Sequence, residues 1–208
     1  MSIRISHVTS GSYVDGPGCR SVVFFKGCSL ACSGCQNTQL WAAAGGQLLD
    51  PEIIASMLMH GNPAGLVTIS GGEPFQQVQG LARLVRSLRS AGARHILVYS
   101  GYTWEQINSG VSGSWLWVQE VLDRIDVLVD GPFVRSADHN LINWRGSANQ
   151  RVIDVARSDR AGSPSLLDWS QPRIVISADG SIFAPVGMAP ALAAAGSVEP
   201  TRRCGQTK

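Results

Sequence analysis

The sequence has no apolar run of membrane-spanning length and almost no lysine. No stretch approaches the roughly 20 apolar residues of a transmembrane helix, and the start, MSIRISHVTSG, has no apolar segment of the secretory-signal type. Lysine occurs only at Lys26 and Lys208, and the formal net charge is only +2. The lack of a long apolar run argues against a membrane protein, and the weak net charge argues against a nucleic-acid partner, although the basic residues are almost all arginine. They predict a cytoplasmic protein.

Cysteine is also scarce, and it is unevenly distributed. The chain has five cysteines in 208 residues, and Cys28, Cys32 and Cys35 fall within eight residues. An odd count with such a cluster does not suit a disulfide framework. In a cytoplasmic chain it indicates metal binding or redox chemistry, with a disulfide between two of these cysteines as the alternative.

The apolar residues that are present follow a regular rhythm. With 44% hydrophobic residues the chain can bury a sizeable core, and its length favours one domain. Four apolar, β-rich runs end in glycine, at 21–27, 65–72, 94–101 and 124–131. Helical patterns occur between them at 50–61, 78–92 and 114–124. The alternation predicts βα units around a parallel sheet, with the chemistry beyond the carboxyl ends of the strands.

The pattern changes after about residue 156. Residues 158–172 have loop composition, and 173–187 alternate around an Ala-Asp-Gly turn, which is typical of a hairpin. The remaining tail is rich in small residues and is expected to be poorly ordered. We therefore predict a core at 1–156 and a C-terminal extension at 157–208.

The three clustered cysteines have the spacing C-x3-C-x2-C and follow the first predicted strand. Three thiolates can hold three corners of a [4Fe–4S] cluster, whereas an electron-transfer ferredoxin uses four. The fourth iron would then be open to a ligand, which indicates binding and reaction. The alternative is a structural zinc site completed by Cys19 or a histidine, although zinc ligands usually come in two close pairs.

Residues 70–74, SGGEP, close the second predicted strand. Gly71 and Gly72 would let a ligand approach the backbone, and the Glu73 carboxylate can pair with an ammonium group. Because this turn and the cysteine loop follow neighbouring strands, we expect them to hold an amino-acid-like ligand from both sides. The amine and carboxylate of that ligand would reach the open iron.

Together these motifs resemble the radical S-adenosylmethionine (SAM) enzymes. DGPGCR (15–20), SGCQN (33–37) and YSGYTWEQI (99–107) narrow the resemblance to the anaerobic ribonucleoside-triphosphate reductase activating proteins, which are glycyl-radical-enzyme activases. Most radical SAM enzymes have an aromatic residue where this chain has Gly34. The most specific match is DVLVDGPFVRSADHNLINWRGSANQRVI (126–153), and the resemblance covers about residues 5–155.

The resemblance implies a function and a fold. The cofactors would be a [4Fe–4S] cluster and SAM, cleaved reductively to methionine and a 5′-deoxyadenosyl radical. That radical would take hydrogen from a glycine of a partner glycyl radical enzyme, here an anaerobic ribonucleotide reductase. A flavodoxin- or ferredoxin-type protein would supply the electron. The fold would be α/β, an incomplete, open (β/α) barrel with a C-terminal β-hairpin and a tail extension.

Residue roles also follow from the resemblance. The predicted cluster ligands are Cys28, Cys32 and Cys35. The predicted SAM-binding residues are Gly34, Gln36, Gly71, Gly72, Glu73 and Asp130. No catalytic residue is predicted beyond the cluster and SAM themselves.

Several assignments stay open at the level of sequence. Arg145 and Arg151 are either part of the site or structural partners of Asp130 or Asp154. Residues 15–18 form either a simple turn or part of the partner-docking region. A radical SAM enzyme that modifies another protein, a peptide or a small metabolite is the alternative function. A non-catalytic iron–sulfur or zinc module is the alternative from another class.

Overall fold

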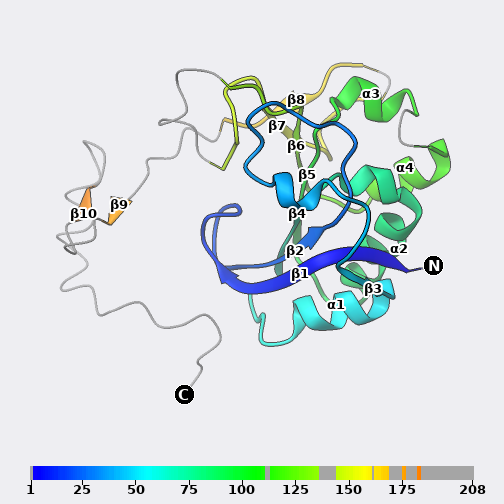
Figure 1. Ribbon diagram of the computed structural model, residues 1–208, viewed down its shortest axis with the longest axis vertical. Helices are drawn as coiled ribbons and strands as arrows, with labels where there is room; N and C mark the ends of the chain where they lie inside the picture. Colours follow the sequence, from blue (N-terminus) through cyan, green and yellow to red (C-terminus); the bar gives the residue numbers. More distant parts are fainter. Residues whose placement is uncertain are drawn as a thin grey trace.

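The computed structural model describes residues 2–110, 113–135, 144–160, 162–168, 175–176 and 182–183. It is an α/β structure with a mixed sheet that does not close on itself, and the described residues include four α-helices (Figure 1). The predicted small-residue tail, including Cys204, lies outside the described residues. None of the helices in the described part has the length and apolarity that crossing a membrane would require.

The centre of the sheet is parallel, as predicted. Its strands are β2 (Arg20–Phe25), β4 (Leu66–Gly71), β5 (His95–Tyr99) and β6 (Val127–Asp130). They are neighbours in this order, and all three pairings are parallel. Each corresponds to one of the four apolar runs, so the periodicity located the central strands correctly.

The two edges of the sheet are antiparallel, so the expectation of a wholly parallel sheet was wrong there. The flanking strands are β1 (Ile3–Ser12), β3 (Gln47–Leu49), β7 (Arg151–Asp154) and β8 (Ser165–Leu166). The order is β3-β1-β2-β4-β5-β6-β7-β8. A parallel neighbour needs a long crossover, usually helical, whereas the short connection from β1 to β2 can only turn back. The polar residues of β1 also hid it from a search for apolar runs.

The helices agree with the sequence pattern except for one. The predicted ones are α1 (Pro51–Met59), α2 (Val78–Ser90) and α4 (Trp115–Leu122). The short helix α3 (Trp104–Asn108) was not predicted, although a capping box on Thr103 and Gln106 marks its start. Two 3-10 turns, η1 (Thr38–Leu40) and η2 (Pro74–Gln77), lie beside the site described below.

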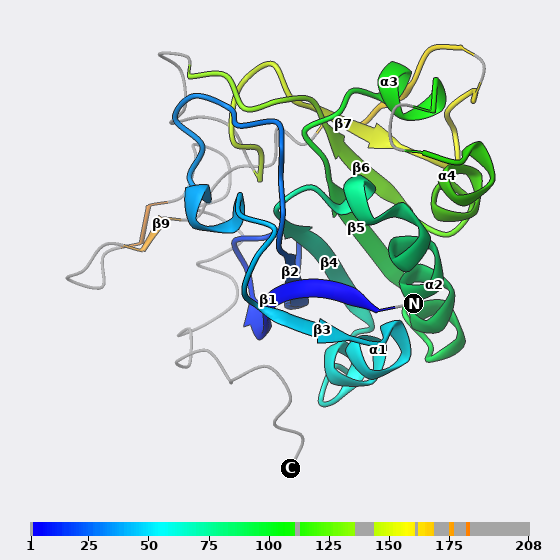
Figure 2. The same ribbon diagram turned by 45° about the vertical axis from the view of Figure 1, so that its right-hand side comes forward.

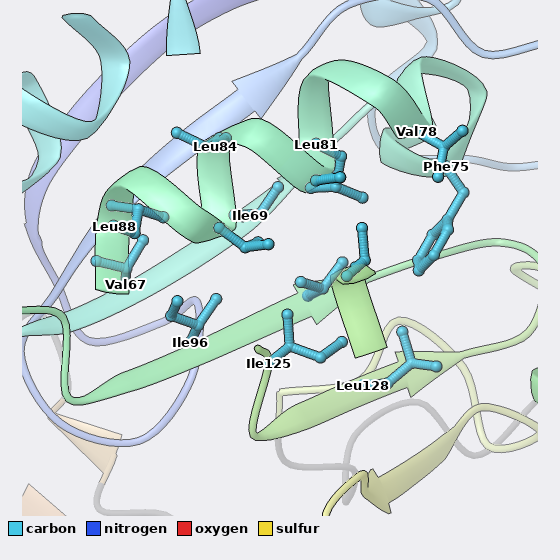
Figure 3. Packing of buried hydrophobic residues seen from close by; sticks show 14 of the residues in the cluster. Val67, Ile69, Phe75, Val78, Leu81, Leu84, Leu88, Ile96, Ile125 and Leu128 are labelled. Atoms are coloured by element: carbon cyan, nitrogen blue, oxygen red, sulfur yellow. The ribbon is translucent and has the colours of Figure 1, made fainter. Parts of the chain in front are cut away.

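Helices α1, α2 and α4 cover one face of the sheet, and the chain around η1 lies on the other side (Figure 2). Figure 3 shows Leu81 and Leu88 of α2 on the side of the helix toward the strands, whereas Leu84 lies on its upper side. All three leucines are fully buried. Burial of each such side chain contributes about 1.5–3 kcal/mol, so this layer fixes α2 on the sheet.

The opposite face of the sheet carries the alternate residues of the same strands. Leu97, Val127 and Val129 form a second, smaller apolar cluster there. The turn at residues 15–18 folds onto this face, because Thr68 Oγ1 donates to the Asp15 carbonyl (2.8 Å) and Arg20 Nη1 donates to the Pro17 carbonyl (3.0 Å). Burial lowers the pKa of Arg20 to about 10. The DGPG segment is therefore a turn, and it is packed against the sheet.

Two further strands follow at the C-terminal end of the chain. Strands β9 (Val175–Ile176) and β10 (Ile182–Phe183) pair antiparallel. This pairing confirms the hairpin predicted at 173–187. The division of the chain into a core at 1–156 and an extension remains a prediction.

Candidate active site

The predicted site residues gather around one cavity of about 540 Å³ at the carboxyl ends of the central strands. Seven of the nine predicted residues line it, namely Cys28, Cys32, Cys35, Gln36, Gly71, Gly72 and Glu73. The rule that chemistry lies beyond the carboxyl ends of parallel strands therefore holds here. Gly34 and Asp130 are not among the residues that line it.

Backbone hydrogen bonds hold the loop that carries the cysteines. Gly27 N donates to Leu40 O (2.8 Å), and Cys28 N donates to Trp41 O (3.0 Å), which fastens the loop to the 3-10 turn η1. The N–H of Asn37 points at Cys35 Sγ (3.4 Å). Such N–H···S contacts favour the thiolate that an iron–sulfur cluster requires.

The three thiols suit an iron–sulfur cluster better than a single metal ion. Cys28, Cys32 and Cys35 are free and half-buried, whereas Cys19 is disulfide-bonded and so is not available as a fourth thiolate. In the part of the chain that the structure describes, no three His, Cys, Asp or Glu side chains converge as ligands of one ion would. A [4Fe–4S] cube binds each thiolate at a different iron, so its ligands need not converge.

Burial raises the pKa of the Cys28 thiol. Because an iron ligand must be a thiolate, metal binding at this position has to overcome that preference for the protonated form.

The glycine turn after β4 packs directly on the cysteine loop. Glu73 N donates to Gly27 O (2.9 Å). A Cβ atom on Gly72 would lie only 2.3 Å from Gly27 O, so any other residue would push the two loops apart. The second glycine of SGGEP is therefore required by the approach of the cysteine loop.

Glu73 is a buried carboxylate held entirely by neutral donors. Its side chain accepts hydrogen bonds from Phe75 N (3.0 Å), Ser100 Oγ (2.9 Å) and Gly101 N (2.7 Å). It is 1% exposed, and burial raises its pKa to about 7. No Lys, Arg or His of the described residues pairs with it. A ligand ammonium group would supply the missing positive charge.

Two adjacent glutamines that the sequence analysis missed fasten the loops together. The Gln76 side chain accepts from Ser29 N (3.1 Å) and donates to Ser29 Oγ (2.6 Å) and Tyr102 Oη (3.1 Å). Gln77 binds the backbone of Arg4 in β1 and the carbonyl of Lys26. Their position just after SGGEP, with only Phe75 between, was the only signal in the sequence.

The far wall of the cavity is aromatic and basic. Tyr99, Phe133, Trp144 and Arg145 all line it. The Tyr99 hydroxyl donates to Trp144 O (2.6 Å), and burial raises the pKa of Tyr99. Arg145 Nε is buried without a hydrogen-bond partner among the described residues. A buried unpaired donor on a cavity wall suits a ligand with acceptor oxygens.

Asp130 does not line this cavity, because strand alternation places its side chain on the helix-covered face with Leu128. Its carboxylate accepts from Arg151 Nε (3.0 Å), Arg151 Nη2 (2.5 Å) and Trp104 N at the start of α3 (2.6 Å). Arg151 lies directly opposite Asp130 in the antiparallel pairing of β6 with β7. The structural alternative for Arg151 is thus the one observed.

Comparison with known proteins agrees with this geometry. Residues 14–153 match a family described as a 4Fe-4S single cluster domain. The chain is 32% identical to the anaerobic ribonucleoside-triphosphate reductase-activating protein of Escherichia coli K12 over 146 residues, 67% of this chain and 90% of that protein.

Two further relatives come from other sources. The protein of the same name from enterobacteria phage T4 is 31% identical over 67% of this chain and 86% of its own length. The pyruvate formate-lyase-activating enzyme of Clostridium pasteurianum is 34% identical over 69% of this chain and 58% of its own length. The chain is therefore an enzyme with an iron–sulfur cluster domain, and it belongs to the radical SAM family of glycyl-radical-enzyme activating proteins.

Proposed function

We propose that this protein generates a glycyl radical on an anaerobic ribonucleoside-triphosphate reductase, with a [4Fe–4S] cluster and SAM bound in the cavity. The observation that carries the proposal is that three free thiols and the buried Glu73 line the same cavity. The names of the relatives from Escherichia coli and phage T4 support this reductase as the partner.

Cys28, Cys32 and Cys35 would hold the cluster, which would leave one iron without a protein ligand. When bound, the reduced cluster would supply one electron to SAM, and the sulfonium C–S bond would break to give methionine and a 5′-deoxyadenosyl radical. A flavodoxin- or ferredoxin-type protein would provide the electron. Because the sheet does not close, we describe the fold as a partial (β/α) barrel whose open side admits a segment of the partner.

The protein's own groups would bind and orient the ligand. Glu73 would pair with its ammonium group, and the backbone of Gly71 and Gly72 would border the methionine moiety. Arg145 Nε is available for an acceptor oxygen of the ligand. Asp130 would contribute indirectly, by holding α3 and β7 in place behind the cavity.

Anaerobic reconstitution tests this proposal. We expect about four iron and four sulfide per chain, formation of 5′-deoxyadenosine with reductant and SAM, and a glycyl-radical electron paramagnetic resonance (EPR) signal on the co-incubated reductase. Cys28→Ser, Cys32→Ser or Cys35→Ser should each abolish all three, whereas Ser33→Ala in the same loop should retain them. One zinc per chain without SAM cleavage would contradict the proposal.

A second candidate function keeps the chemistry and changes the substrate. The pyruvate formate-lyase-activating relative shows that the family includes activases of other enzymes. SAM cleavage by the wild-type protein that leaves the ribonucleotide reductase without a radical would favour this alternative.

A further inference from the structure

The polar side chains of WRGSANQ bind the chain's own backbone. Gln150 Nε2 donates to Gly131 O (2.9 Å), and Asn149 Nδ2 donates to Pro132 O (2.8 Å). Ser147 Oγ accepts from Val134 N (3.1 Å). Three side chains thus fix the segment 131–134, which directly follows β6.

The same three residues are braced by one another. Gln150 Oε1 accepts from Gly146 N (2.7 Å) and Ser147 N (3.2 Å), and Ser147 Oγ donates to Asn149 Oδ1 (2.7 Å). Ser147 is fully buried. Because their polar atoms already have protein partners, these residues position the segment 131–134, and Gln150 also lines the cavity.

The residue that this arrangement holds at the cavity is Phe133. Its ring lies between two glycines, one from the cysteine loop and one from the WRGSANQ block. A Cβ atom on Gly34 would lie 3.3 Å from Phe133 Cε1, and a Cβ atom on Gly146 would lie 3.1 Å from Phe133 Cδ2. These ring atoms are diagonally opposite, so the two glycines lie near opposite ends of the ring. Phe133 also lines the cavity together with Cys35 and Glu73.

We propose that Phe133 is a specificity-determining residue that packs against the adenine base of SAM. The inference rests on the proposed use of SAM. Gly34 has no side chain, and Phe133 fills the space beside it from a distant part of the chain. The ammonium and carboxylate of the ligand have polar partners in the cavity, whereas a flat purine needs an aromatic surface.

The test compares ligands with and without the base on the reconstituted, full-length protein. Dissociation constants for SAM and for methionine are measured anaerobically. Phe133→Ala should weaken SAM binding about ten- to one-hundred-fold, the usual range for loss of one stacked base, and leave methionine binding and iron content unchanged. Phe133→Tyr should restore SAM affinity to within about twofold, because it keeps the aromatic face. Val134→Ala is the matched control, since Val134 is 48% exposed and outside the cavity.

A second variant keeps the ring and moves it. Gly146→Ala would crowd Phe133 Cδ2 and should also weaken SAM selectively. Unchanged SAM affinity in Phe133→Ala, or equal losses for SAM and methionine, would overturn the assignment while leaving the proposed function intact. Failure of the wild-type protein to bind SAM would overturn the proposed function itself.

Discussion

At the scale of single residues, the site depends on side chains whose partners come from other loops. Glu73 is the clearest case, because its three hydrogen-bond donors are neutral and its burial is nearly complete. The motif SGGEP predicted a carboxylate facing an ammonium group. It gave no indication that the carboxylate would be destabilised in its charged form.

The raised pKa of Glu73 predicts a pH dependence of apoprotein stability. Its pKa lies near 7 in the folded chain and near 4.5 in a free side chain. The folded state therefore holds the proton more tightly, and stability from this group is complete below about pH 4.5 and lost as the pH rises through 7. The loss is on the order of 3 kcal/mol.

Denaturant unfolding of the apoprotein from pH 5 to 8 measures this effect. Relative to wild type, Glu73→Gln should gain stability steadily across that range. Glu52→Gln is the control for replacing a glutamate by glutamine, because the Glu52 side chain is 56% exposed. A Glu73→Gln difference that does not change with pH would show that Glu73 titrates normally.

At the scale of elements, short connections between loops carry the site. The turn η2 follows SGGEP and directs Gln76 to the cysteine loop, while the end of β6 is joined through Asp130 and Arg151 to β7 and α3. Both sets of hydrogen bonds join segments that are far apart in the sequence. Removal of Gln76 and removal of Arg151 test them separately.

Removal of the Gln76 side chain should loosen the cluster. Gln76→Ala breaks both bonds to Ser29, the neighbour of Cys28, and a hydrogen bond contributes about 1 kcal/mol, or roughly fivefold in an equilibrium. We expect cluster absorbance to bleach about fivefold faster with an iron chelator, while apoprotein stability changes little. Gln79→Ala, at an exposed glutamine of α2, should bleach at the wild-type rate. Equal rates for the two variants would rule out the role of Gln76.

Removal of Arg151 should destabilise the fold. Asp130 is 1% exposed and would be left as a buried charge without its partner, which typically costs about 3 kcal/mol. Urea unfolding of Arg151→Ala measures the loss. Arg157→Ala is the control, because Arg157 is 79% exposed and its ion pair with Asp154 is a surface pair worth at most about 1 kcal/mol. If both variants lost a similarly small free energy of unfolding, the pair of Asp130 with Arg151 would not behave as a buried ion pair.

At the scale of the whole molecule, the sheet extends past the predicted core boundary. Strand β8 pairs with β7, and Leu167 N donates to Val152 O (2.8 Å). Leu167 also packs against the smaller apolar cluster. We therefore propose that the folding unit includes β8 and that the boundary lies nearer residue 168 than residue 156.

Two shortened chains test this boundary. A chain of residues 1–168 should unfold at a higher urea concentration than a chain of residues 1–156, because only the longer one keeps β8 and Leu167. Strand pairing and partial burial of one leucine predict a difference of about 1–3 kcal/mol. Equal midpoints would return the boundary to residue 156.

The sequence located much of the fold and site because the signals were local. Apolar runs identified β2, β4, β5 and β6, and motifs next to strand ends identified the cysteines and SGGEP. The antiparallel strands β1 and β7 were missed because they are short of apolar residues or follow long loops. Phe133 and Gln76 were missed because nothing near them in the sequence indicates which distant loop they contact.

By itself, the sequence determined which candidate ligand side chains the chain has and how they are spaced. Three thiols at a fixed spacing and a carboxylate after the next strand are covalent facts, and the parallel pairing of β2 with β4 brings them together. Only the tertiary structure decided which side of the sheet each side chain serves. Strand alternation and the antiparallel register of β7 turned Asp130 toward Arg151 and away from the cavity, and the WRGSANQ bonds placed Phe133 beside Gly34. The orientation of Asp130 and the position of Phe133 depend on contacts between segments that are distant in the sequence and become neighbours only in the folded chain.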